Sequence, residues 1–249
     1  WWSGPIRPKH PNVTKVPRYW AVIPSAGGGA RMGLGKPKQY LPLRGRALLE
    51  WSLAPFLDTG WIDGVVLVLS KGDTDFAKLP IAGHPKIFIA AGGASRADSV
   101  LAGLQAVAER SASLDAPVYV LVHDAARPCL TVDDIETLRD EASDEQGGLL
   151  AVPVTDVLKL EEKETSARTV GHAELWYAQT PQLFRLDLLR TSLERAVAGG
   201  KALGDEASAM ELSGHRPALV KGRQSNLKVT YPEDLPLAEF WLSRQDYLR

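Results

Sequence analysis

The chain has little cysteine and no long apolar run, and each absence excludes a class of protein. Its 249 residues include one cysteine, Cys129, so an internal disulfide is excluded and a reducing cytoplasm is the expected compartment. The apolar runs, such as 65–69 and 118–122, stay far below the roughly 18 residues of a membrane span, so we expect no membrane protein. No H-E-x-x-H motif or Cys/His cluster occurs, which argues against structural zinc.

The chain also lacks an excess of charge of one sign. Its net charge is −1, which argues against a protein held on nucleic acid mainly by phosphate contacts. Residues 1–18 are unbalanced: they contain four basic residues, four prolines and no acid. We interpret 1–18 as a flexible extension or an expression remnant, with a docking arm as the alternative, and 19–249 as a single domain.

Short apolar runs alternate with amphipathic segments along the rest of the chain. Several of the runs are continuous in Val, Leu and Ile, as in strands that are covered on both faces. The pattern predicts strands at 19–23, 64–69, 87–90, 118–122, 148–154, 218–220 and 227–230.

Helix signals lie between these strands. Ser95 with Asp98, and Thr131 with Asp134, are capping pairs, and each precedes an apolar stripe. A helix over 185–198 is expected to stop at the glycines that follow it, and another to start near Pro232. The alternation predicts an α/β fold, Rossmann-like, with a mostly parallel sheet, helices on both faces and ligands at the carboxyl ends of the strands.

Residues 156–174 break this alternation. They carry the charged run 161–164 between two extended-looking segments. We expect a protruding β-arm here, over about 154–175. A solvated loop and a subunit-clasping arm are both consistent with the pattern.

A glycine-rich loop follows the first predicted strand, at 24–33. Glycines let backbone N–H groups approach an anion closely. The loop fails the G-x-x-x-x-G-K-[ST] pattern at both ends, and it lacks the third glycine of G-x-G-x-x-G. Three cations, Arg31, Lys36 and Lys38, accompany it. This combination favours a nucleoside triphosphate site, whereas a structural turn would explain the glycines alone.

Several stretches in order identify a resemblance. They are 24–40, 92–100 with its Arg-Ala-Asp-Ser-Val, 122–128 with His-Asp-Ala-Ala-Arg-Pro, 180–182 (Thr-Pro-Gln), 205–208 (Asp-Glu-Ala-Ser) and 226–230 (Asn-Leu-Lys-Val-Thr). Together they resemble the 2-C-methyl-D-erythritol 4-phosphate cytidylyltransferases of the non-mevalonate isoprenoid pathway, over about 19–242. The resemblance implies cytidylyl transfer from CTP to that polyol phosphate with release of pyrophosphate.

The resemblance also implies site residues. Arg31, Lys38 and Lys228 are expected to be catalytic cations at the triphosphate, and Asp124 to hold Mg²⁺. The nucleotide is expected to contact Pro24, Ser25, Ala26, Gly27, Gly29, Gly93, Arg96 and Ser99. The acceptor is expected to contact Asp124, Ala125, Arg127, Val157, His172, Thr180 and Gly204. The arm is expected to make a homodimer. Because His123 alternates with Asp124, we expect it to point away from the site.

The acceptor residues depart from the family pattern at three positions. Val157 stands where a threonine is usual, His172 where an arginine is usual, and Gly204 where some members have threonine. Loss of one charged phosphate contact costs about 1.5–3 kcal/mol, or roughly ten- to hundredfold in affinity. The alternatives are therefore another acceptor such as ribitol 5-phosphate, or a CTP-binding protein with weakened turnover. A nicotinamide oxidoreductase is disfavoured by the failed glycine fingerprint.

Overall fold

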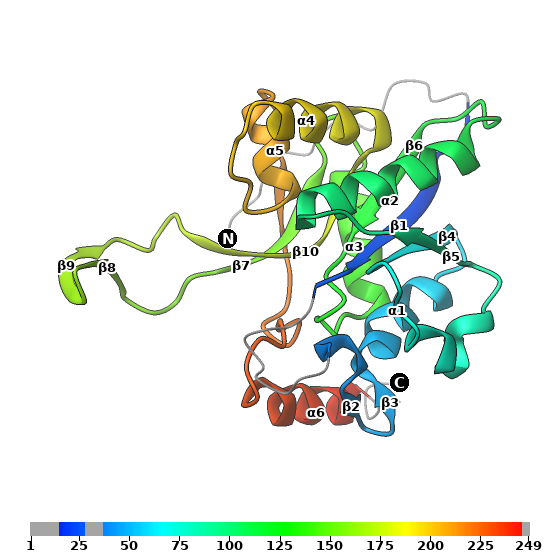
Figure 1. The fold of residues 1–249 in the computed structure, drawn as a ribbon. Helices are drawn as coiled ribbons and strands as arrows, with labels where there is room; N and C mark the ends of the chain where they lie inside the picture. Colours follow the sequence, from blue (N-terminus) through cyan, green and yellow to red (C-terminus); the bar gives the residue numbers. More distant parts are fainter. Residues whose placement is uncertain (1–14, 28–36, 246–249) are drawn as a thin grey trace.

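A seven-stranded sheet forms the centre of the molecule (Figure 1). The computed structural model describes residues 15–27 and 37–245. The sheet order is β11-β7-β10-β6-β1-β4-β5. These strands are β1 (Arg18–Ser25), β4 (Ile62–Leu69), β5 (Ile87–Ala91), β6 (Val118–Val122), β7 (Gly148–Pro153), β10 (Trp176–Arg185) and β11 (Ala218–Lys221). Only β10 runs antiparallel to its neighbours in this sheet, so the predicted mostly parallel α/β fold is confirmed.

Alternating side chains of the strands build a core on each face of the sheet. Along β1, Tyr19, Ala21 and Ile23 pack with α1 (Leu48–Asp58) and α3 (Val132–Ala142). Trp20 and Val22 point to the other face, which α2 (Arg96–Ser111), α4 (Leu186–Ala198) and α5 (Glu206–Leu212) cover. Because helices close both faces, only the ends of the strands remain open for a ligand.

A third apolar cluster supports one end of the sheet. It joins α6 (Asp234–Gln245) to the short hairpin β2 (Pro42–Leu43) and β3 (Arg46–Ala47), and it includes Cys129 and Val229. Burial raises the pKa of the Cys129 thiol to about 12, in line with a small core residue. Short 3₁₀ turns η2 (Lys38–Tyr40), η3 (Phe76–Lys78) and η4 (Pro80–Gly83) complete the elements. The cluster fixes the segments that carry Lys38 and Lys228.

Both predicted capping pairs are present. The Ser95 hydroxyl accepts from the Asp98 N–H at the start of α2, and Thr131 does the same with Asp134 at the start of α3. Gly199 caps the end of α4 as expected. The last helix begins at Asp234, two residues after Pro232.

One predicted strand is absent from the structure, and one observed strand was not predicted. The strand expected at 227–230 is wrong: this segment has no strand, and its apolar residues pack into the third cluster, with one backbone bond from Val229 N–H to Ala126 O (2.8 Å). The pattern also missed β10, which lies between β7 and β6. Its register shifts between Ala178 and Gln182, where Pro181 has no N–H to give to a ladder.

A two-stranded hairpin extends away from the body (Figure 1). It is formed by β8 (Leu158–Glu162) and β9 (Thr165–Val170), which pair only with each other. Lys163 and Glu164 at its tip adopt positive φ angles, as a tight hairpin turn requires. The expected hairpin is thus present. Among the described residues, no helix is both long and apolar enough to cross a membrane.

Candidate active site

A cavity of about 350 Å³ lies at the carboxyl ends of β1 and β6. Five segments meet there: the end of β1, the turn η2, the turn into α2, the loop after β6, and the loop before α6. The cavity is lined by Pro24, Ser25, Ala26, Gly27, Lys38, Gln39, Gly93, Ala94, Ser95, Arg96, Ser99, Asp124, Ala125, Ala126, Lys228 and Thr230. Folding therefore brings together most of the residues expected to contact the nucleotide; Gly29 and Arg31 lie outside the described residues.

The turn into α2 forms one wall of the cavity. The N–H of Gly93 donates to Ser99 Oγ (3.2 Å), and that hydroxyl donates to Ser95 O (2.9 Å). A Cβ on Gly93 would lie 2.3 Å from Asp98 Cβ, so packing on the first turn of α2 demands glycine there. Among the described residues, no atom lies within 4 Å of a Cβ position on Gly27.

Gln39 connects that loop to η2, although the sequence analysis did not single it out. Its side chain is buried, and Nε2 donates to Ser25 O (2.9 Å). Its neighbour Lys38 donates from Nζ to Val229 O (2.7 Å), across the loop before α6. These two bonds hold the ends of the glycine loop against the opposite wall.

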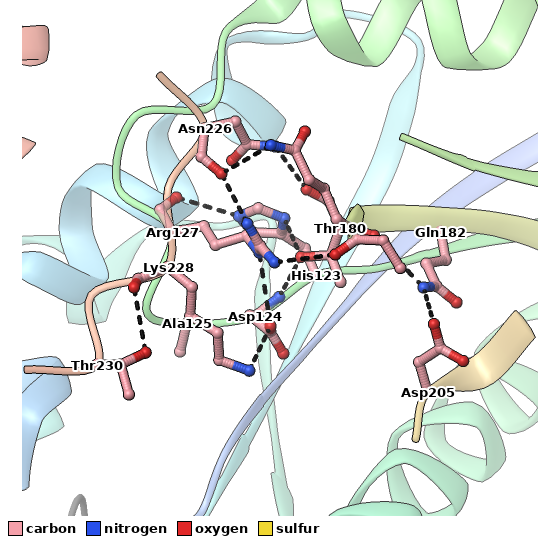
Figure 2. Close-up of polar contacts among 12 residues, drawn as sticks. His123, Asp124, Ala125, Arg127, Thr180, Gln182, Asp205, Asn226, Lys228 and Thr230 are labelled. Atoms are coloured by element: carbon pink, nitrogen blue, oxygen red, sulfur yellow. Dashed lines mark hydrogen bonds and ion pairs between the residues drawn. The ribbon is translucent and has the colours of Figure 1, made fainter. Parts of the chain in front are cut away.

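Asp124 lies among three cations, of which Figure 2 shows Arg127 and Lys228. Its Oδ2 is 2.8 Å from Lys228 Nζ and 3.6 Å from Arg127 Nε, and its Oδ1 is 3.3 Å from Arg96 Nη2. Burial alone would raise the pKa of Asp124, but these cations outweigh it and hold the pKa well below the usual range. Asp124 is thus a permanent anion at physiological pH.

Arg96 lines the cavity with the other residues expected to contact the nucleotide, and its guanidinium pairs with Asp124 and Glu206. Its contact with the nucleotide stays a prediction. Glu206 is 1% exposed and accepts from Nη1 (2.6 Å) and Nη2 (3.1 Å) of Arg96. Burial would lower the pKa of Arg96, and the two carboxylates outweigh that and raise it. Glu206 is part of the 205–208 stretch that carries the resemblance, but the sequence assigns it no role; a cation at the first residue of a helix is the signal for an acidic partner.

Two of the expected acceptor residues are buried behind Asp124. Arg127 donates to Asn226 O (2.7 Å) and is 8% exposed. The Thr180 hydroxyl accepts from Asp124 N–H (3.0 Å) and contacts His123 Nδ1 (3.0 Å), as Figure 2 shows. Neither residue lines the cavity, whereas Ala125 does. Both hold the loop that presents Asp124.

His123 lies in the core, as its alternation with Asp124 predicted. It is fully buried, and burial lowers its pKa to about 4, so the ring is neutral. Because Arg127 O can only accept, Nε2 carries the proton toward it (3.3 Å) and Nδ1 accepts from Thr180.

The three unusual acceptor residues lie away from the cavity. Val157, at the base of the hairpin, is 61% exposed, and His172 is half-buried where the chain returns from the hairpin. Gly204 is exposed just before α5, and a Cβ there would meet only Ser208 Oγ, at 3.6 Å. Space for a larger side chain is therefore available at position 204. None of the three residues contacts the cavity of its own chain.

The donor set of the cavity fits a hard cation shared with phosphates. In the described part of the chain, Asp124 is the one acidic residue that lines it, and no group of three or more His, Cys, Asp or Glu is placed to hold a metal. Mg²⁺ commonly uses one or two carboxylates together with waters and substrate phosphates. Asp124 is the residue that can take this role.

Comparisons with known proteins agree on one family. The family described as 2-C-methyl-D-erythritol 4-phosphate cytidylyltransferase matches residues 19–244. Relatives with that name from Cronobacter sakazakii and Salmonella paratyphi B are each 50% identical, over 90% of this chain and 93% of theirs. A crystal structure of a 4-diphosphocytidyl-2C-methyl-D-erythritol synthase is 35% identical with a TM-score of 0.78, over 90% of this chain and 98% of that one. The Thermus thermophilus cytidylyltransferase is 33% identical, with a TM-score of 0.74 over 91% and 99%.

Proposed function

This chain belongs to the 2-C-methyl-D-erythritol 4-phosphate cytidylyltransferase family, and from that membership we propose that the cavity at the ends of β1 and β6 performs its reaction. The enzyme transfers a cytidylyl group from CTP to 2-C-methyl-D-erythritol 4-phosphate, in isoprenoid precursor biosynthesis. A phosphate oxygen of the acceptor attacks the α-phosphorus of CTP. The bond from the α-phosphorus to the bridging oxygen breaks, and pyrophosphate leaves with that electron pair.

The observation that carries this proposal is the arrangement of two lysines beside a carboxylate in the cavity. Lys38 donates to the backbone oxygen of Val229, the residue after Lys228, so the two lysines lie on neighbouring segments. Asp124 pairs with Lys228 at 2.8 Å. Two phosphate groups must approach each other in this reaction, so fixed cations at the α-phosphate stabilise the charge that builds up there. No covalent nucleophile is required. The cations and the backbone of the β1 loop then act by binding and orienting CTP.

We assign the remaining predicted residues by their position. Pro24, Ala26, Gly93 and Ser99 surround the space next to α2 and are assigned to the nucleotide. Asp124 and Ala125 face the acceptor. Asp124 would hold Mg²⁺, which when bound neutralises phosphate charge. Thr180 and Arg127 act through the loop that they support.

We propose that the β8–β9 hairpin joins two subunits into a homodimer and supplies acceptor contacts to the cavity of the partner. Nearly all of its side chains are exposed, and an isolated two-stranded hairpin is marginally stable in water. Val157, Leu160 and Trp176 expose apolar surface on or beside it. His172 and Val157 would then meet the partner's cavity. The cytoplasmic location expected from the single cysteine stays a prediction.

An acceptor comparison tests the function. Pyrophosphate release from Mg-CTP is measured with methylerythritol phosphate and with ribitol 5-phosphate. We expect methylerythritol phosphate to give a kcat/KM at least about tenfold higher, the difference that one charged hydrogen bond supplies. Release with ribitol 5-phosphate alone would assign the acceptor site to another polyol phosphate. CTP binding without release from either acceptor would leave a nucleotide-binding protein and overturn the proposal.

A further inference from the structure

Arg96 is shared unequally between two carboxylates from different elements. It is the first residue of α2, Glu206 is the first residue of α5, and Asp124 follows β6. Glu206 takes both terminal nitrogens of the guanidinium, at 2.6 and 3.1 Å. Asp124 receives a single longer bond, at 3.3 Å. The stronger, bidentate contact therefore belongs to the carboxylate that is outside the cavity.

The bonded contact of Glu206 with the cavity runs through Arg96. Glu206 itself does not line the cavity, whereas Arg96 and Asp124 both do. Its side chain is 1% exposed, and a buried carboxylate is stable only when a cation is paired with it. Its position at the start of α5 also suits an anion, whereas the position of Arg96 at the start of α2 does not suit a cation. Each side chain thus compensates the other in this pair.

The charge around Asp124 depends on this pairing. Lys228 contacts one oxygen of Asp124 at 2.8 Å, and Arg96 only weakly contacts the other. If Arg96 lost its bond to Glu206, its two nitrogens would turn to Asp124 and form the bidentate pair there. Asp124 would then be satisfied by Arg96 and Lys228 together, and a substrate hydroxyl or a cation would have to displace them.

We propose that Glu206 is a positioning residue that draws the Arg96 guanidinium away from Asp124 and so keeps the Asp124 carboxylate available to the acceptor. The inference rests on the proposed function, because it assumes that Asp124 serves the acceptor. The effects on the acceptor and on CTP should be separable, because Gly93 and Ser99 hold the wall that faces the nucleotide base without a contribution from Glu206. Loss of Glu206 should therefore weaken the acceptor side and spare CTP.

The test is Glu206→Gln, which keeps the shape of the side chain and removes its charge. Steady-state pyrophosphate release is measured in both substrates, and CTP binding by calorimetry. We expect the acceptor KM to rise about tenfold or more while the dissociation constant of CTP stays within about twofold. Glu50→Gln is the matched control, because Glu50 is also buried and, within the described part of the chain, its side chain bonds to Ala47 N–H (2.8 Å), outside this cavity.

A double-mutant cycle shows whether Glu206 acts through Arg96. In an Arg96→Gln background, Glu206→Gln should leave the acceptor KM unchanged, because no guanidinium is left to reposition. Glu206→Asp serves as a second variant if the glutamine variant does not fold, and it should lie between wild type and Glu206→Gln. Equal losses in CTP and acceptor, or additive effects in the cycle, would overturn the inference. A wild-type chain that releases no pyrophosphate would instead overturn the proposed function.

Discussion

Single residues at the end of β6 have roles that the sequence alone identifies only in part. Asp124 is predictable, because a carboxylate that follows a buried strand of a parallel sheet lies at the ligand edge. The direction of the Arg96 side chain was not predictable, since it depends on Glu206, which is 110 positions away in the chain. The same limit applies to Thr180. Its hydroxyl is used within the protein, by Asp124 and His123.

His123 predicts how stability depends on pH. The native ring is neutral because burial lowers its pKa to about 4, whereas an unfolded histidine titrates near 6.5. As pH falls from 6.5 toward 4, the histidine of the unfolded state binds a proton, whereas the native ring stays unprotonated. The free energy of unfolding should therefore decrease over this range, by about 3 kcal/mol in total, and this effect fades as pH rises above 6.5.

Urea unfolding at pH 7.0, 5.5 and 4.5 measures this dependence. The variant His123→Asn lacks the titrating ring, so its free energy of unfolding should fall less steeply than that of the wild type. Asp124 is present in both proteins, so its contribution cancels when their slopes are compared. Parallel slopes for the two proteins would show that His123 is not the residue responsible.

At the scale of elements, the prediction succeeded where periodicity was simple. The capped helices α2 and α3 begin where Ser95 and Thr131 indicate, because a side-chain cap is a local interaction. It failed for β10, whose register is interrupted near Pro181 and whose pairing partners are distant in the chain. It also failed at 227–230, where alternating apolar residues pack against α6 without a neighbouring strand. Long-range packing decided both cases.

The hairpin provides the prediction at this scale. Replacing residues 157–171 with Gly-Ser-Gly removes an element that adds no residue to any of the three core clusters. The melting temperature and CTP binding should therefore change little. If the hairpin joins two subunits, sedimentation velocity should show a dimer for the full chain and a monomer for the truncated one. A dimer that survives the truncation would place the interface elsewhere.

At the scale of the whole molecule, three packed clusters place five segments around one cavity. The two clusters that cover the sheet fix the ends of β1 and β6 and the start of α2, and the third fixes Lys38 and Lys228. The α/β class followed from the alternation of elements. The meeting of α6 with the β2–β3 hairpin did not, because it carries no local signal. The resemblance assigned Lys228 to the site, and the structure shows that the carboxylate of Asp124 faces it.

The rate of cytidylyl transfer by Lys228→Met tests this account most directly. Lys201→Met, an exposed lysine after α4, is the matched control. Asp124 keeps Arg96 and Arg127 in the Lys228 variant, so its melting temperature should be close to that of the wild type. Pyrophosphate release from CTP and methylerythritol phosphate should fall in kcat by about a hundredfold for Lys228→Met and remain unchanged for Lys201→Met. A wild-type kcat in the folded Lys228→Met protein would contradict the assignment of this cavity as the site of the reaction.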